Sequence, residues 1–103
     1  MAWQVNWTEV AHNDLDKIAS YIAQDSENYA AAFVREVLDA ARSLEQLAQR
    51  GRVVPERQDS AIRELVVMNY RLIYQLAEPV VSIIGVIHGA RDLEALWKRQ
   101  GHR

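Results

Sequence analysis

The 103 residues fit one compact domain, and we expect residues 1–103 to fold as a single domain. Half of the residues are hydrophobic and 25% are charged, a composition typical of a globular protein rather than of a disordered chain. The absence of cysteine excludes disulfides and thiolate metal sites, and a formal net charge of -2 excludes a uniformly basic surface for nucleic acid.

The sequence predicts a cytoplasmic protein. Its first residues lack the basic start and apolar run of a secretory signal, and no stretch approaches the length needed to span a bilayer. The three histidines are scattered, without the spacing of a ligand pair, so we expect neither a metal nor a cofactor.

The N-terminal half predicts a strand followed by two helices. Residues 3–7 alternate between apolar and polar side chains, which is the period of a strand with one buried face. Thr8 can cap a helix that reaches about Gln24, in which apolar residues recur every three or four positions. Ser26 can cap a second helix, which we expect to end near Gly51 with the glycine as a left-handed stop. The short break between the helices predicts an antiparallel helical hairpin.

The second half is rich in β-branched and aromatic residues and predicts three strands, at residues 61–68, 70–78 and 80–89. Short turns join them in an antiparallel meander, with an edge strand or loop before them. In the middle strand one face is cleanly apolar and is expected to lie under the helices: Tyr70, Leu72, Tyr74 and Leu76.

Residues 92–99 predict a short C-terminal helix with Leu93, Leu96 and Trp97 on one side. A helix this short is not stable alone in water, so it must pack on the domain or on a partner. The expected fold class is therefore α+β: an N-terminal strand, an antiparallel helical hairpin packed on a mainly antiparallel sheet, and a short C-terminal helix.

Several weak motifs occur in one order along most of the chain. They are A-x-x-D-L-x-x-I-x-x-Y-I from Ala11 to Ile22, G-R-x-x-P-E from Gly51 to Glu56, R-E at Arg63-Glu64, Y-R-L-I-Y from Tyr70 to Tyr74, and V-I-H-x-x-R ending in His88 and Arg91. In this order the chain resembles the ParE/RelE toxin superfamily, and in particular its ParE-like branch of plasmid stabilisation proteins.

The resemblance implies the toxin of a type II toxin–antitoxin system, neutralised by a cognate antitoxin, ParD-like or similar, whose C-terminal segment wraps it. It further implies a toxin–antitoxin hetero-oligomer that contacts DNA only through the antitoxin. RelE-like members cleave messenger RNA in the ribosome, whereas characterised ParE-like members poison DNA gyrase. A third hypothesis is a non-toxic member kept only as an antitoxin-binding partner.

The residues favour gyrase over RNA as the target. RelE-like members carry lysines on the strand before the Y-R motif and a catalytic tyrosine near the C-terminus. Here that strand has Arg63 and Glu64 but no lysine, no tyrosine follows Tyr74, and a carboxylate at Glu64 opposes phosphate. The alternative is a metal-independent endoribonuclease that uses Arg71, His88 and Arg91, with His88 as the general base.

We also expect Arg71 or Arg63 to pair with Glu64 in a structural role. The expected target-binding residues are Arg63, Arg71, His88, Arg91 and Trp97. The expected antitoxin-binding residues are Ile73, Ile84, Val86, Leu96 and Trp97. Of these, the first three are candidates for the sheet face opposite the helical hairpin, which a two-layer domain leaves partly uncovered.

Overall fold

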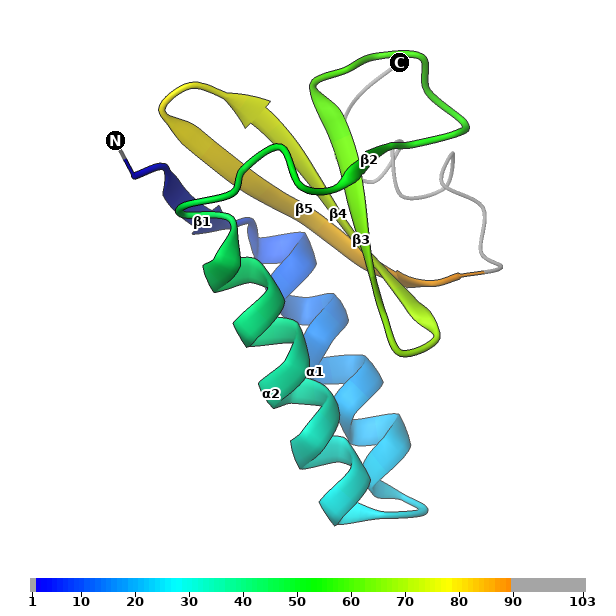
Figure 1. Cartoon of the computed structure of the whole chain (residues 1–103). Coiled ribbons are helices and arrows are strands. Elements are labelled where there is room, and N and C mark those ends of the chain that lie inside the picture. The colour runs from blue at the N-terminus through cyan, green and yellow to red at the C-terminus, as the bar shows by residue number, and fades with distance from the viewer. Residues whose placement is uncertain (1, 90–103) are drawn as a thin grey trace.

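The computed structural model describes residues 2–89, which form two layers. One layer is a helical hairpin, and the other is a sheet that the hairpin covers on one face (Figure 1). The elements in chain order are β1 (Gln4–Trp7), α1 (Glu9–Ala23), α2 (Glu27–Ser43), β2 (Arg52–Val53), β3 (Ile62–Val67), β4 (Tyr70–Ala77) and β5 (Val80–His88). The strand order is β1-β5-β4-β3-β2, with β1 parallel to β5 and every other pair antiparallel. The expected α+β class is confirmed, while the expected C-terminal helix lies outside the described residues.

Both helices begin at the predicted caps. The Thr8 hydroxyl accepts a hydrogen bond from the Ala11 N–H at 3.2 Å, and the Ser26 hydroxyl accepts one from the Tyr29 N–H at 3.0 Å. No helix within residues 2–89 is long and apolar enough to cross a membrane.

The predicted end of the second helix is wrong. α2 stops at Ser43, where the hydroxyl donates to the Ala40 carbonyl at 2.6 Å and the chain continues in turns. Leu44 and Ala48 stay buried in these turns, so the apolar spacing outlasts the helix. Gly51 is not a left-handed stop, because its φ lies outside the positive range. A glycine is needed at this position because neighbouring atoms leave no room for a Cβ atom.

The strand faces follow the predicted alternation in β1 and β4. Alternate residues of both strands contact the helix-side core, which is built around Phe33, Val37 and Leu44. A second, smaller core lies on the opposite face of the sheet and consists of Val54, Ile62, Ile73, Ile84 and Ile87.

The sequence predicts Val86 and Ile84 on the same face of the sheet, and this prediction is wrong. The register of β4 against β5 shifts between Ile73 and Tyr74, whose partners are Gly85 and Ile83, so Ile84 is an extra residue without a partner in β4. This β-bulge reverses the alternation after it, and Val86 packs in the helix-side core. Ile84 is on the predicted face, with 3% of its surface exposed.

α1 covers the edge of β5 that β1 leaves open. β1 pairs with β5 only as far as Trp7 and Ile83, and beyond that point the Ile83 carbonyl accepts from the Thr8 hydroxyl at 2.9 Å. Nearly two turns further along α1, the buried Asp14 carboxylate accepts from the Val86 N–H at 3.2 Å. The aspartate of the first helical motif therefore satisfies a buried backbone group.

Candidate functional site

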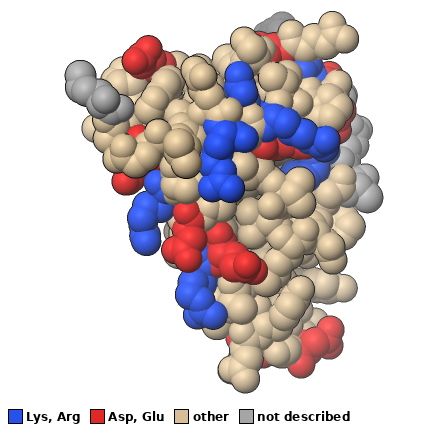
Figure 2. All heavy atoms as spheres, viewed as in Figure 1, with Lys and Arg blue, Asp and Glu red and all other residues tan. Residues whose placement is uncertain are grey.

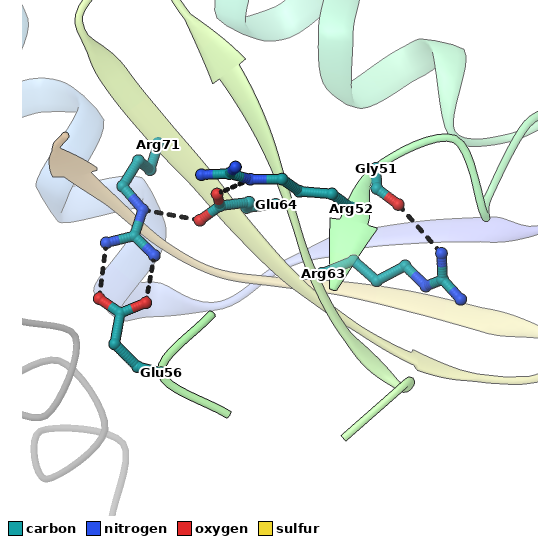
Figure 3. A network of polar contacts seen from close by, with 6 residues as sticks. All are labelled: Gly51, Arg52, Glu56, Arg63, Glu64 and Arg71. Atoms are coloured by element: carbon teal, nitrogen blue, oxygen red, sulfur yellow. Dashed lines mark hydrogen bonds and ion pairs between the residues drawn. The ribbon is translucent and has the colours of Figure 1, made fainter. Parts of the chain in front are cut away.

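Four charged side chains form a chain of alternating sign on the sheet face opposite the helices (Figure 3). Arg52 of β2 donates through Nε to Glu64 of β3. The second oxygen of Glu64 accepts from Nε of Arg71 in β4 at 2.7 Å. The two terminal nitrogens of Arg71 bind both oxygens of Glu56 at 2.8 and 2.9 Å, a bidentate pair. Each of the three guanidinium nitrogens of Arg71 thus donates to a carboxylate.

The centre of this chain is buried and its ends are exposed. The side chain of Glu64 is 0% exposed and that of Arg71 is 8% exposed, whereas those of Arg52 and Glu56 are 66% and 35% exposed. The hydrogen bonds with Arg71 lower the pKa of Glu56, and the same contact with Glu56 raises the pKa of Arg71. Both groups are therefore charged at neutral pH.

Glu56→Gln is expected to lower the free energy of unfolding by about 1 kcal/mol at pH 7, because the pair with Arg71 is partly screened by solvent. Folding lowers the pKa of Glu56 from its usual 4.5. The ionised carboxylate therefore contributes fully to the free energy of unfolding above pH 4.5, and this contribution is lost as the pH falls through the lowered pKa. Urea unfolding should show a difference between wild type and variant that vanishes in acid. Glu78→Gln, in an exposed turn, should show no comparable difference at pH 7; an equal loss there would contradict the account.

Strand register explains why these residues meet. Arg52 and Glu64 are cross-strand partners, and alternation places Glu64 and Arg71 on the same face of β3 and β4. The loop after β2 brings Glu56 to Arg71. Of the two arginines expected to pair with Glu64, Arg71 does so. The sequence reasoning did not choose Arg52 or Glu56, although both belong to the G-R-x-x-P-E motif.

A second set of contacts holds the segment before β2. The buried Tyr74 hydroxyl accepts from the Gly51 N–H at 2.9 Å and donates to the Ala48 carbonyl at 3.0 Å, and burial raises its pKa. Arg63 donates to the carbonyls of Gln49 and Gly51 at 3.2 and 3.0 Å. The expected target-binding residue Arg63 is thus engaged with the backbone of its own chain.

His88 does not face Arg71 across the strands. It is the cross-strand partner of Tyr70, whose ring it meets edge-on with centroids 5.4 Å apart. Arg71 is the partner of Ile87, so alternation directs Arg71 and His88 to opposite faces. Both nevertheless line an open hollow of about 620 Å³ at this end of the sheet. Arg91, Leu96 and Trp97 lie outside the described residues.

Surface charge is mixed in this region. Figure 2 shows Lys and Arg atoms gathered in the upper part of the molecule, over the region of β2, with Asp and Glu atoms among and below them. Of the residues expected to bind antitoxin, Ile73 and Ile84 are 0% and 3% exposed. Their burial removes the reason for expecting an open apolar surface there.

Comparisons with known proteins agree with this architecture. The family model described as ParE toxin of the type II toxin–antitoxin system parDE matches residues 5–93. Toxin RelE2 of Caulobacter vibrioides is 37% identical over 89 residues, which are 85% of this chain and 97% of that protein.

Two solved structures share the fold. A chain of the chromosomal ParDE system from P. aeruginosa superposes with a TM-score of 0.69 at 20% identity, over 84% of this chain and 96% of its own. A chain of the RelBE2 toxin–antitoxin complex from Mycobacterium tuberculosis superposes with a TM-score of 0.61 at 24% identity, over 85% of this chain and 99% of its own.

Proposed function

Because the chain belongs to the ParE toxin family of type II toxin–antitoxin systems, we propose that it stops growth by binding DNA gyrase and that a cognate antitoxin neutralises it. The main observation in favour of a protein target over RNA is that Arg71 donates to two carboxylates of its own chain. A metal-free ribonuclease needs cations directed at a charged phosphorane, and the charge of Arg71 is already offset by the two carboxylates of Glu56 and Glu64.

The position of His88 supports the same choice. A general base must reach the proton that it removes, and in the nuclease hypothesis that proton lies beside the phosphate held by Arg71. His88 lines the same hollow as Arg71, but its strand position directs it to the other face of the sheet and it packs on Tyr70. The toxin therefore acts through its surface rather than through a proton donor.

A ribosome-dependent endoribonuclease is the second candidate. The observation in its favour is the 37% identity with a protein called Toxin RelE2. In that case Arg71, His88 and Arg91 carry the reaction, and Glu56 must leave Arg71 when RNA binds. The antitoxin partner is common to both candidates, because the structural relatives come from a ParDE system and a RelBE2 complex.

The proposal is tested with purified components. Toxin prepared from its antitoxin complex should inhibit supercoiling by gyrase or trap cleaved DNA, and should leave messenger RNA intact on translating ribosomes. Cleaved messenger RNA together with normal supercoiling would replace the gyrase proposal by the nuclease. In cells, induction of the toxin alone should arrest growth, and co-expression of the adjacent antitoxin gene should restore growth. Normal growth of cells that contain soluble toxin would leave only the hypothesis that the chain is a non-toxic member of the family.

His88→Ala is expected to reduce toxicity by less than about tenfold, measured as the inducer concentration that halves the growth rate. The loss of a catalytic proton-transfer group costs about 100-fold or more, so the two hypotheses predict different results. His12→Ala, which changes an exposed histidine of α1, is the matched control. Abolished toxicity of a folded His88→Ala protein would favour the nuclease.

A further inference from the structure

Arg63 of β3 is held in place by carbonyl groups and not by carboxylates. Its Nε donates to the Ser60 carbonyl at 2.9 Å, and its Nη1 donates to the carbonyls of Gln49 and Gly51. Within residues 2–89 it forms no ion pair, and its Nη2 donates to no group. Carbonyl oxygens carry no net charge, so they fix the guanidinium without offsetting its positive charge.

Arg50 brings a second cation to the same place. It precedes Gly51 in the chain, and its Nη1 donates to the Ser43 hydroxyl at 2.8 Å, which is also a neutral acceptor. The Gly51 N–H donates to the buried Tyr74 hydroxyl, so both arginines lie close to this hydroxyl. Burial raises the pKa of Tyr74, and the charges of Arg63 and Arg50 oppose the rise. No carboxylate in the described part of the chain pairs with either arginine.

The charge-neutral network lies on the other face of the sheet. Arg63 and Glu64 follow each other in β3, and alternation directs their side chains to opposite faces. The Glu64 carboxylate accepts from Arg52 and Arg71 on its own face (Figure 3). It is therefore not directed at Arg63, whose charge stays available for an anion from another molecule.

The donor groups of the two arginines favour phosphate over carboxylate. A planar carboxylate is bound best by two parallel donors of one guanidinium. Arg63 offers Nη2 alone, because its other two nitrogens already donate to carbonyls. A phosphodiester has two charged oxygens that point in different directions, so it can accept from two separate guanidinium groups. Arginine contacts of this kind position proteins on DNA.

The surroundings favour a duplex over a single strand. Proteins that bind single strands stack the bases on exposed aromatic side chains. The exposed tyrosines are Tyr21 and Tyr29, and no tryptophan or phenylalanine between residues 2 and 89 is exposed. Both tyrosines flank the turn between α1 and α2, at the far end of the helical hairpin from β2 (Figure 1). Arg50 and Arg63 can thus contact a backbone, but neither has an exposed tyrosine beside it on which a base could stack.

We propose that Arg50 and Arg63 form a direct contact of this toxin with the phosphate backbone of duplex DNA. The contact is independent of base sequence, because it involves only phosphate oxygens. It goes beyond the proposed function and does not require it, since it belongs to the toxin alone. If the toxin does act on gyrase, whose substrate is duplex DNA, the same contact adds to its affinity for the gyrase–DNA complex.

The test measures the binding of antitoxin-free toxin to a duplex of mixed sequence, by fluorescence anisotropy at several salt concentrations. Arg50→Gln combined with Arg63→Gln should weaken binding about tenfold or more. The slope of log affinity against log salt should become shallower by about 0.9 for each lost contact. Arg50→Gln alone loses one bond to a hydroxyl, so it decides the test if Arg63→Gln disturbs the fold.

The matched control is Lys17→Gln combined with Arg35→Gln, which removes the same charge from exposed positions of α1 and α2 and should leave the affinity within about twofold. Equal loss in this control would assign binding to net charge and overturn the inference. Absence of duplex binding by the wild type at about 50 mM salt would overturn it as well, as would unchanged affinity of the Arg50 and Arg63 variants.

Single-stranded RNA of the same length provides the second comparison. Tighter binding of RNA than of duplex DNA, lost with the same arginines, would replace DNA by RNA as the ligand. The supercoiling assay separates this inference from the proposed function. A toxin that binds duplex DNA but leaves gyrase active contradicts only the proposed function, whereas one that inhibits gyrase without binding duplex DNA contradicts only this inference.

Discussion

Replacing Gly51 with alanine is expected to destabilise the protein by about 3 kcal/mol or more, the high end of overpacking effects. A Cβ atom at this position would lie 2.4 Å from the Tyr74 hydroxyl and 2.6 Å from the Glu64 carbonyl oxygen. The tyrosine could move only by giving up its bonds to Gly51 and Ala48, and the carbonyl belongs to the backbone of β3. The methyl group therefore displaces both the segment before β2 and the strand that carries Glu64.

Gly89→Ala is the matched control for this prediction. The nearest atom to its added Cβ would be the Asn69 carbonyl oxygen at 3.2 Å, which a shift of a few tenths of an ångström relieves. Urea unfolding should give a change within about 1 kcal/mol for Gly89→Ala. Equal stabilities for the two variants would show that the close approach of Gly51 to Tyr74 is not needed for the fold.

Replacing Glu64 with glutamine is expected to lower the free energy of unfolding by about 3 kcal/mol. Its fully buried carboxylate lies between Nε of Arg52 and Nε of Arg71. Glutamine presents one oxygen and one NH2 group to these two donors, so the contact with either Arg52 or Arg71 becomes repulsive. Glu36→Gln on the exposed side of α2 should change the stability by less than about 0.5 kcal/mol.

A double-mutant cycle separates the network from the individual side chains. Because Glu64 and Arg71 act on each other, Glu64→Gln combined with Arg71→Gln should destabilise the protein by less than the sum of the two single effects, with a coupling of about 1 kcal/mol or more. Additive effects in folded proteins would contradict the description of these residues as one network.

The sequence predicted the elements whose patterns are local. The alternation in residues 3–7 and in β4 placed both strands on the correct faces, and the caps at Thr8 and Ser26 were correct. These features depend on side chains two to four positions apart. They therefore appear in the sequence before any tertiary contact is known.

Features that depend on distant contacts were missed. The bulge at Ile84 reverses the faces of the last part of β5. Gly85, inside the strand and next to the bulge, was the one local signal for it, and the sequence reasoning did not use it. The role of Gly51 is set by Tyr74, 23 residues later. Arg52 and Glu56 were visible as a motif, but their meeting with Glu64 and Arg71 depends on the register of β2 and on the path of the loop after it.

The measurement that tests the central claim most directly is the response of cells to the toxin alone. In a host without the antitoxin, induction is followed by a DNA-damage reporter and by the rate of amino-acid incorporation, both from the first minutes. If the toxin acts on gyrase through protein contact, the reporter should rise while incorporation continues. An immediate stop of incorporation with cleaved messenger RNA and a silent reporter would contradict the account and assign the activity to the ribosome.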